Sequence, residues 1–96
     1  MRSLQRYSSK ASDWCAEGHR LMLIKQYREA VSAFNKAIDG DTTYAPAYFF
    51  RGACHYLIGN YRLANDDMDT AAILGYRDAQ FWSKFEMRGS RNTDHS

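Results

Sequence analysis

Residues 11–44 read ASDWCAEGHRLMLIKQYREAVSAFNKAIDGDTTY, and residues 45–78 read APAYFFRGACHYLIGNYRLANDDMDTAAILGYRD. The two stretches align without a gap at a period of 34 residues, and eight aligned pairs are identical. These pairs are Ala11/Ala45, Gly18/Gly52, Leu23/Leu57, Ile24/Ile58, Tyr27/Tyr61, Arg28/Arg62, Ala30/Ala64 and Ala37/Ala71. A third copy begins at Ala79. Self-similarity at a fixed period of this length is typical of arrays in which one small structural unit stacks on the next.

Apolar residues within each stretch recur every three or four positions, which is the spacing of a helix and not the alternation of a strand. The spacing predicts helices over residues 12–24, 28–39, 46–57, 62–74 and 78–88. Residues that favour helix ends fall between these ranges. The expected ends and caps are Gly40, Gly59-Asn60 and Gly75 at C-termini, Pro46 in a first turn and Asp78 as an N-terminal cap.

Side chains of two sizes recur at fixed places in the repeat. A helical hairpin closes only where small residues let the two backbones approach, and large residues fill the spaces between helices. The small positions are Gly18, Ala30, Ala37, Gly52, Ala64 and Ala71. The large positions are Trp14, Tyr27, Phe34, Tyr48, Tyr61, Met68 and Trp82. We predict that all of them pack within or between hairpins.

This pattern resembles the tetratricopeptide repeat, whose W-x2-L-G-x2-Y, A-x3-F and A signature occurs in the same order and spacing. The chain departs from the signature at Glu17 and Arg51, where Leu is usual, and at Thr42 and Tyr76, where Pro is usual. The resemblance implies an all-α, right-handed α-solenoid of two helix-turn-helix repeats with a capping helix. Its expected parts are repeat 11–44, repeat 45–78 and capping helix 78–88 within a domain 11–88, a basic tail or helix extension 1–10, and a disordered tail 89–96.

Composition limits the class of protein. A chain of 96 residues with 45% hydrophobic residues fits one folded domain. A net charge of +2 is too small to indicate a nucleic-acid partner. No apolar run approaches the length of a membrane span, and residues 1–10 lack the apolar region of a secretory signal. Cys15 and Cys54 match neither a disulfide scaffold nor a paired zinc motif. We therefore expect a soluble, cytoplasmic protein that binds neither nucleic acid nor membranes.

The family resemblance also implies that the first helix of each pair lines a concave groove in which partner peptides lie. The candidate groove residues are Cys15, His19, Met22, Phe49, Phe50, Ala53, Tyr56 and Lys84. Most of them are apolar or aromatic, and only Lys84 carries a permanent charge. The groove thus lacks the converging Lys, Asn and Arg side chains with which some members of the family bind acidic chaperone tails.

These residues predict a non-catalytic protein-interaction module, a scaffold or adaptor that binds a protein or peptide segment through apolar contacts. Two alternatives remain open. The chain could be a structural homo-oligomer that buries the same groove, or its open C-terminal end with Phe81 and Trp82, against a second copy. Phe49 and Phe50 could instead belong to the core of the single molecule.

Motifs for catalysis or for a cofactor are absent from the sequence. Cys15 and His19 share a helix face, but nothing completes a nucleophilic pair or a zinc site. Asp66, Asp67 and Asp69 lie in a predicted helix and not in a calcium-binding loop, so we expect a solvated convex face there. No glycine-rich phosphate loop, nucleophile elbow or HExxH motif occurs. We expect no enzymatic activity, no metal and no cofactor.

Overall fold

The computed structural model describes residues 10–82, and within this range the chain forms five helices and no strand. The helices are α2 (Ala11–Leu23), α3 (Tyr27–Gly40), α4 (Ala45–Leu57), α5 (Tyr61–Ile73) and α6 (Arg77–Trp82). The first four agree with the predicted ranges to within one residue at each end. The fifth begins one residue before its predicted start. The expectations for residues 1–9 and 83–96, including Lys84 and the disordered tail, lie outside the described residues.

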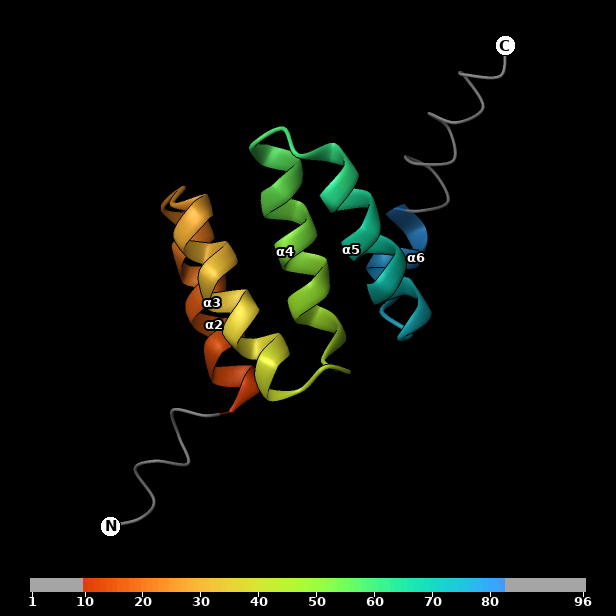
Figure 1. Ribbon diagram of the computed structural model, residues 1–96, viewed down its shortest axis with the longest axis horizontal. Helices are drawn as coiled ribbons and strands as arrows, with labels where there is room; N and C mark the ends of the chain where they lie inside the picture. The colour runs from red at the N-terminus through yellow and green to blue at the C-terminus, as the bar shows by residue number, and fades with distance from the viewer. Residues whose placement is uncertain (1–9, 83–96) are drawn as a thin grey trace.

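Each helix packs on the helix that follows it in the chain. The pairs α2/α3 and α4/α5 form hairpins, α3 packs on α4 between them, and α5 packs on α6. Figure 1 shows α4 with the α2/α3 hairpin on one side and α5 on the other. The first helices of the two hairpins, α2 and α4, also touch. The fold is therefore all-α, and its consecutive helix packing fits a helical repeat.

The turns after α2, α4 and α5 each contain one residue with left-handed backbone. Gly59 and Gly75 have φ angles of +90° and +97°, a region where glycine carries no steric penalty. Lys25 occupies the position aligned with Gly59 and has a φ of +64°. The first turn thus places a non-glycine residue in a conformation that disfavours a Cβ atom.

Two expected helix ends are wrong. Gly40 is the last residue of α3, and the cap that follows it, Asp41, has extended backbone, so this turn needs no left-handed residue. Asp78 lies inside the first turn of α6 and not before it. Its carboxylate there still faces the positive end of the helix dipole. Pro46 lies in the first turn of α4, as predicted.

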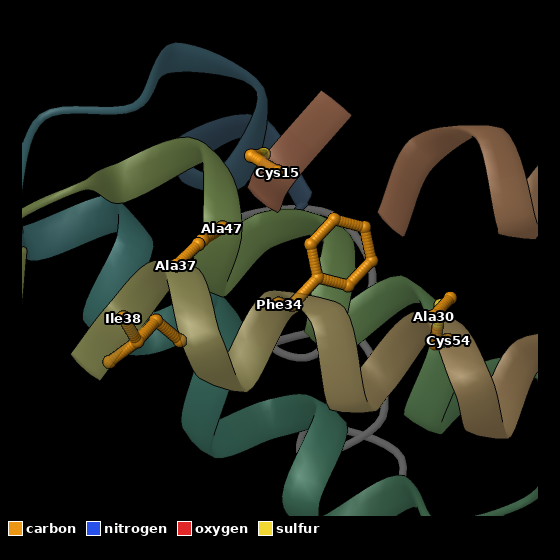
Figure 2. Packing of buried hydrophobic residues seen from close by; sticks show 7 residues of the cluster. All are labelled: Cys15, Ala30, Phe34, Ala37, Ile38, Ala47 and Cys54. Carbon is orange, nitrogen blue, oxygen red and sulfur yellow. The ribbon is translucent and has the colours of Figure 1, made fainter. Parts of the chain in front are cut away.

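The larger core cluster joins α2, α3 and α4. Its buried residues are Cys15, Ala30, Phe34, Ala37, Ile38, Ala47 and Cys54. Figure 2 shows these residues, with the Phe34 ring at the centre. A Cβ atom built on Gly18 would lie 2.5 Å from Cε1 of Phe34, closer than real Cβ contacts. The ring therefore occupies the space that a side chain at position 18 would need.

A smaller cluster joins α4, α5 and α6. Met68, Ala71 and Ala79 are fully buried in it, and the partly buried residues around them include Tyr48 and Trp82. Tyr48 packs against both clusters and so bridges the two hairpins.

The predicted packing positions differ in how far they are buried. Those that are fully or almost fully buried are Gly18, Ala30, Phe34, Ala37, Gly52, Ala64, Met68 and Ala71. Those that are half-buried are Trp14, Tyr27, Tyr48 and Trp82. Tyr61 is 58% exposed, although it aligns with Tyr27. The Tyr61 ring contacts Tyr56 at a centroid distance of 5.1 Å.

Candidate functional site

Four side chains from three parts of the chain form a continuous row of rings, which we call the aromatic strip. It consists of His19 on α2, Phe50 and Phe49 on α4, and Tyr76 in the turn before α6. Successive ring centroids lie 5.0, 5.2 and 4.9 Å apart. These separations are those of favourable aromatic pairs. The strip thus crosses from the first hairpin to the end of the second.

The strip is anchored in the core at one point. The Phe50 ring stacks on the buried Phe34 ring at a centroid distance of 6.1 Å. Phe49 and Phe50 are themselves only half-buried, and His19 is exposed. Rings that are fixed on one side and accessible on the other offer contact area that loses little conformational entropy on binding.

A second aromatic group lies further along α4. Tyr56 is 43% exposed, and its ring contacts Trp82 edge to face at 5.2 Å and Tyr61 at 5.1 Å. Ala53 lies between Phe49 and Tyr56 in the sequence of α4 and packs against the smaller core cluster. The α4 helix therefore carries accessible aromatic surface over most of its length.

An open pocket of about 300 Å³ adjoins the His19 end of the strip. Its lining residues are Ser12, Cys15, Ala16, His19, Tyr44, Pro46 and Phe50. None of these side chains carries a carboxylate, an ammonium or a guanidinium group. Burial raises the pKa of the Cys15 thiol to about 11, so the thiol is neutral near pH 7 and is not an activated nucleophile.

The predicted groove residues fall into three sets. Cys15, His19 and Phe50 meet around the pocket, with Cys15 only 6% exposed. Phe49, Ala53 and Tyr56 face the α6 end. Met22 is half-buried against the larger core cluster. Tyr76, which completes the strip, was missed because its position in the turn was considered only as a replacement for Pro.

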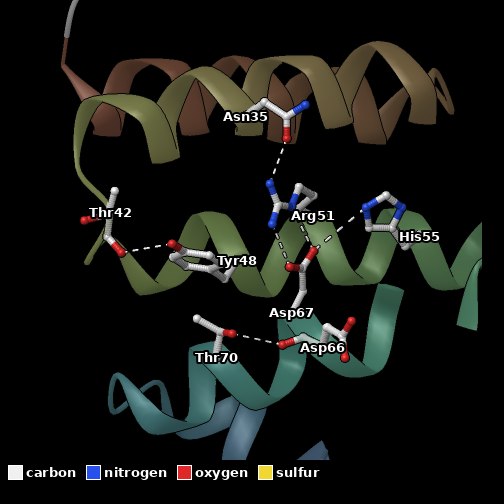
Figure 3. A network of polar contacts seen from close by, with 8 residues as sticks. All are labelled: Asn35, Thr42, Tyr48, Arg51, His55, Asp66, Asp67 and Thr70. Carbon is white, nitrogen blue, oxygen red and sulfur yellow. Dashed lines mark hydrogen bonds and ion pairs between the residues drawn. The ribbon is translucent and has the colours of Figure 1, made fainter. Parts of the chain in front are cut away.

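The structure also contains a polar cluster that the sequence did not predict (Figure 3). Arg51 on α4 donates two hydrogen bonds to the Asp67 carboxylate on α5, at 2.8 and 2.7 Å. A third hydrogen bond, of 2.8 Å, joins Arg51 Nη1 to Oδ1 of Asn35 on α3. The Arg51 guanidinium lies over the Tyr48 ring at 5.6 Å from its centroid. One side chain thus connects three helices and both repeats.

The expectation of a fully solvated acidic face on α5 is therefore wrong for one residue. Asp66 and Asp69 are exposed, but Asp67 is 5% exposed. A buried carboxylate needs a partner, and Arg51 supplies it. The sequence held a signal, because Arg51 stands where Leu is usual and Asp67 aligns with an alanine, Ala33, in the first repeat. A positive and a negative residue at these two positions of one hairpin indicate an ion pair.

His55 lies beside this ion pair. Its Nε2 is 3.9 Å from an Asp67 carboxylate oxygen, and its buried Nδ1 has no hydrogen-bond partner in the described part of the chain. Burial lowers the pKa of His55 below its ordinary value, and the Asp67 charge opposes this shift only in part. Because burial dominates over the carboxylate, the imidazole is neutral near pH 7.

Two further findings concern residues 10–82, the described part of the chain. No three His, Cys, Asp or Glu side chains in this range lie close enough together to hold a metal ion. Over the same range, none of the helices combines the length and the apolar character that crossing a bilayer requires.

Comparison of the chain with protein-family models, with curated proteins and with solved structures finds no match.

Proposed function

We propose that the helices form a right-handed solenoid of two tetratricopeptide-like repeats, with α6 as the start of a capping helix. The 34-residue period and the packing of each helix on the next support this proposal. In such a solenoid the helices α2, α4 and α6 line one side. The aromatic strip runs across that side.

On this surface the protein acts as a non-catalytic interaction module that binds a segment of a partner protein. The observation that carries the proposal is the aromatic strip, in which rings from three elements meet at 4.9–5.2 Å beside an uncharged pocket. Half-buried rings at the centre of a surface are typical of binding hot spots, each worth about 2 kcal/mol or more. A surface of this size fits micromolar affinity, about −8 kcal/mol.

Selection from a phage-displayed library of short random peptides tests the proposal. The protein is the bait, and the double variant His19→Ala with Phe50→Leu is the counter-selection. Phe50→Leu keeps an apolar side chain against Phe34 but removes the aromatic face, and His19 is exposed, so this variant should fold. Circular dichroism and thermal unfolding verify that it does.

The matched control is Ile73→Ser, because Ile73 is 84% exposed on α5 and lies outside the strip. We expect enriched peptides that bind the wild type and Ile73→Ser equally and bind the double variant at least tenfold more weakly. Peptides that bind all three proteins alike, or no enrichment at all, contradict the proposed function.

A second candidate function, self-association, is favoured by a different surface. A pocket of about 430 Å³ is lined only by residues of the first hairpin, among them Trp14, Leu21 and Lys36. Trp14 aligns with Tyr48, which in the second repeat packs against the preceding hairpin. A helix from a second copy would cover the equivalent place. Light scattering over a wide range of concentrations tests this candidate, and a monomer throughout that range excludes it.

A further inference from the structure

The aromatic strip differs from many peptide-binding surfaces in having no formal charge. Neither the strip nor the lining of its pocket contains Asp, Glu, Lys or Arg. The carboxylates of Asp41 and Asp78 act on the phenols of Tyr44 and Tyr76 from outside the pocket lining. An acidic segment would therefore meet these carboxylates, and among the described residues no cationic side chain belongs to the strip or lines the pocket. A basic segment would find no carboxylate within the pocket.

The surface offers hydroxyl groups as donors instead. Ser12 and Tyr44 line the pocket, and Tyr76 ends the strip. In the described part of the chain, no other residue accepts a hydrogen bond from the hydroxyl of Tyr44 or of Tyr76. By contrast, the Tyr48 hydroxyl already donates to the carbonyl of Thr42 at 3.0 Å. Burial is the main cause that raises the pKa of Tyr44 and of Tyr76, so both phenols keep their protons near pH 7.

The two hydroxyls belong to the two ends of the aromatic strip. The Tyr44 phenol interacts electrostatically with both Cys15 and Tyr76, and Tyr76 interacts with Cys15 in turn. A ligand that follows the strip would find Tyr44 near the His19 end and Tyr76 at the other end. Uncharged donors of this kind suit backbone carbonyl oxygens.

The size of the pocket argues against a helical ligand. A volume of about 300 Å³ is at the lower end for small-molecule pockets and accommodates one or two side chains. A helix with its side chains is about 10 Å or more across and satisfies its own carbonyls, so it would leave the phenol donors unused. An extended segment keeps its carbonyls available.

Among extended segments, one class fits both the rings and the donors. A polyproline II segment has no internal hydrogen bonds, and proline rings stack on aromatic side chains in grooves. It repeats every three residues, about 9 Å, while each step along the strip is 4.9–5.2 Å. The four rings therefore face a stretch of at most about five ligand residues. Such a ligand is also ordered before it binds, which reduces the entropic cost.

We propose that the partner segment is an uncharged, proline-rich stretch in the polyproline II conformation, held by the aromatic strip and by hydrogen bonds from Tyr44 and Tyr76 to its carbonyl oxygens. This inference rests on the proposed function. It adds the conformation and chemistry of the ligand.

The peptides enriched in the selection described above are the probes. We expect proline well above its frequency in the library and no fixed charged position. Synthetic peptides with capped ends, measured by fluorescence anisotropy, should change in Kd less than about twofold between low and high salt. Replacing their prolines by alanine should weaken binding at least tenfold. The variant Tyr44→Phe should weaken binding about three- to tenfold, because one hydrogen bond is lost.

The outcomes separate this inference from the proposed function. Peptides that need His19 and Phe50 but carry helical spacing, fixed charges or strongly salt-dependent affinity overturn the polyproline assignment and leave the binding surface standing. Unchanged affinity in both Tyr44→Phe and Tyr76→Phe overturns the role of the hydroxyls. Failure to enrich any peptide that depends on the strip overturns both proposals.

Discussion

The two hairpins share one repeat but are closed in different ways. In the first, Gly18 faces the rigid, fully buried Phe34 ring. In the second, a Cβ atom on Gly52 would lie 3.0 Å from Asp67 Cβ and 3.3 Å from the end of the Met68 side chain, and the Arg51–Asp67 ion pair ties α4 to α5. The same repeat positions therefore accommodate either an apolar contact or a partly buried ion pair. The 34-residue period therefore determines where the helices meet. The residue types at individual positions determine which contacts hold them together.

Removing one member of the ion pair should have the largest effect. In Asp67→Ala, Arg51 keeps its hydrogen bond to Asn35 and its contact with the Tyr48 ring, but neither partner carries a charge. The Arg51 side chain is 23% exposed, so part of its charge stays desolvated without a counter-charge. We expect the free energy of unfolding to fall by about 3 kcal/mol. Urea unfolding followed by far-UV circular dichroism measures this value.

The double variant Arg51→Leu with Asp67→Ala makes the second hairpin apolar like the first. It should unfold within about 1 kcal/mol of the wild type, because it leaves no unpaired charge. The control is Glu17→Gln, which breaks an ion pair to Arg20 whose side chains are 39% and 65% exposed and should cost less than about 0.5 kcal/mol. The free energy of unfolding lost in the double variant could instead equal the sum of the losses in Arg51→Leu and Asp67→Ala. In that case an apolar contact cannot replace the ion pair in the second hairpin.

Alanine substitutions at the aligned glycines, Gly18 and Gly52, test the close approach of the two helices in each hairpin. Gly18→Ala should destabilise by about 2 kcal/mol, since the new methyl group overlaps the Phe34 ring. Gly52→Ala should stay within about 1 kcal/mol of the wild type. Its nearest neighbour, Asp67 Cβ, lies at 3.0 Å, and alanine gains helix propensity. Thermal and urea unfolding give both values.

A double-mutant cycle sharpens this result. Adding Phe34→Met, the residue type found at the aligned position 68, should remove most of the cost of Gly18→Ala. Strictly additive energies in this cycle would mean that the ring is not what excludes a side chain at position 18.

The turns offer a third comparison. Lys25→Gly should stabilise the protein by about 0.5–1 kcal/mol, because Lys25 has a φ of +64° and its counterpart Gly59 has a φ of +90°. The larger entropy of glycine in the unfolded chain reduces this gain. Lys25→Ala serves as the control, since it removes the side chain but keeps Cβ. Equal stability of the two variants would contradict a backbone origin.

The smallest expected effect is a pH dependence confined to the second hairpin. Because the folded state lowers the pKa of His55, the unfolded chain takes up the proton first as the pH falls. Stability is full above the ordinary histidine pKa of about 6.5 and is lost as the pH drops from there toward the lowered value. The slope for one proton cannot exceed about 1.4 kcal/mol per pH unit.

His55→Gln should flatten this dependence, measured as urea midpoints from pH 7.5 down to about pH 5. His19→Gln, at an exposed position, should leave it unchanged. Two charged groups lie near His55, namely Arg51 on the same helix α4 and Asp67 on α5. A slope that persists in His55→Gln would contradict His55 as its origin.

The helices could be predicted from the sequence because packing in a repeat restricts the side-chain size at each position, and side-chain size follows directly from the residue type. The sequence did not show which charged residue is buried. Asp67 lies close to the exposed Asp66 and Asp69, and its partner Arg51 is sixteen positions away. Gly40 was expected to form a left-handed cap on its identity alone, whereas Lys25 adopts that conformation because its turn requires it. Three members of the aromatic strip followed from helix position. Tyr76 did not, because a turn residue has no periodicity.

Cys15 and Cys54 lie on the two helices that contribute most to the candidate surface, and both thiols are buried. Burial raises the pKa of each to about 11, so neither reacts readily while its surroundings stay closed. A thiol-specific reagent would therefore report transient openings, with Cys15 sensitive to separation of α2 and Cys54 to loosening of α4. The two cysteines are therefore natural probes of local unfolding. Their labelling rates, with and without a bound peptide, would show which hairpin opens first.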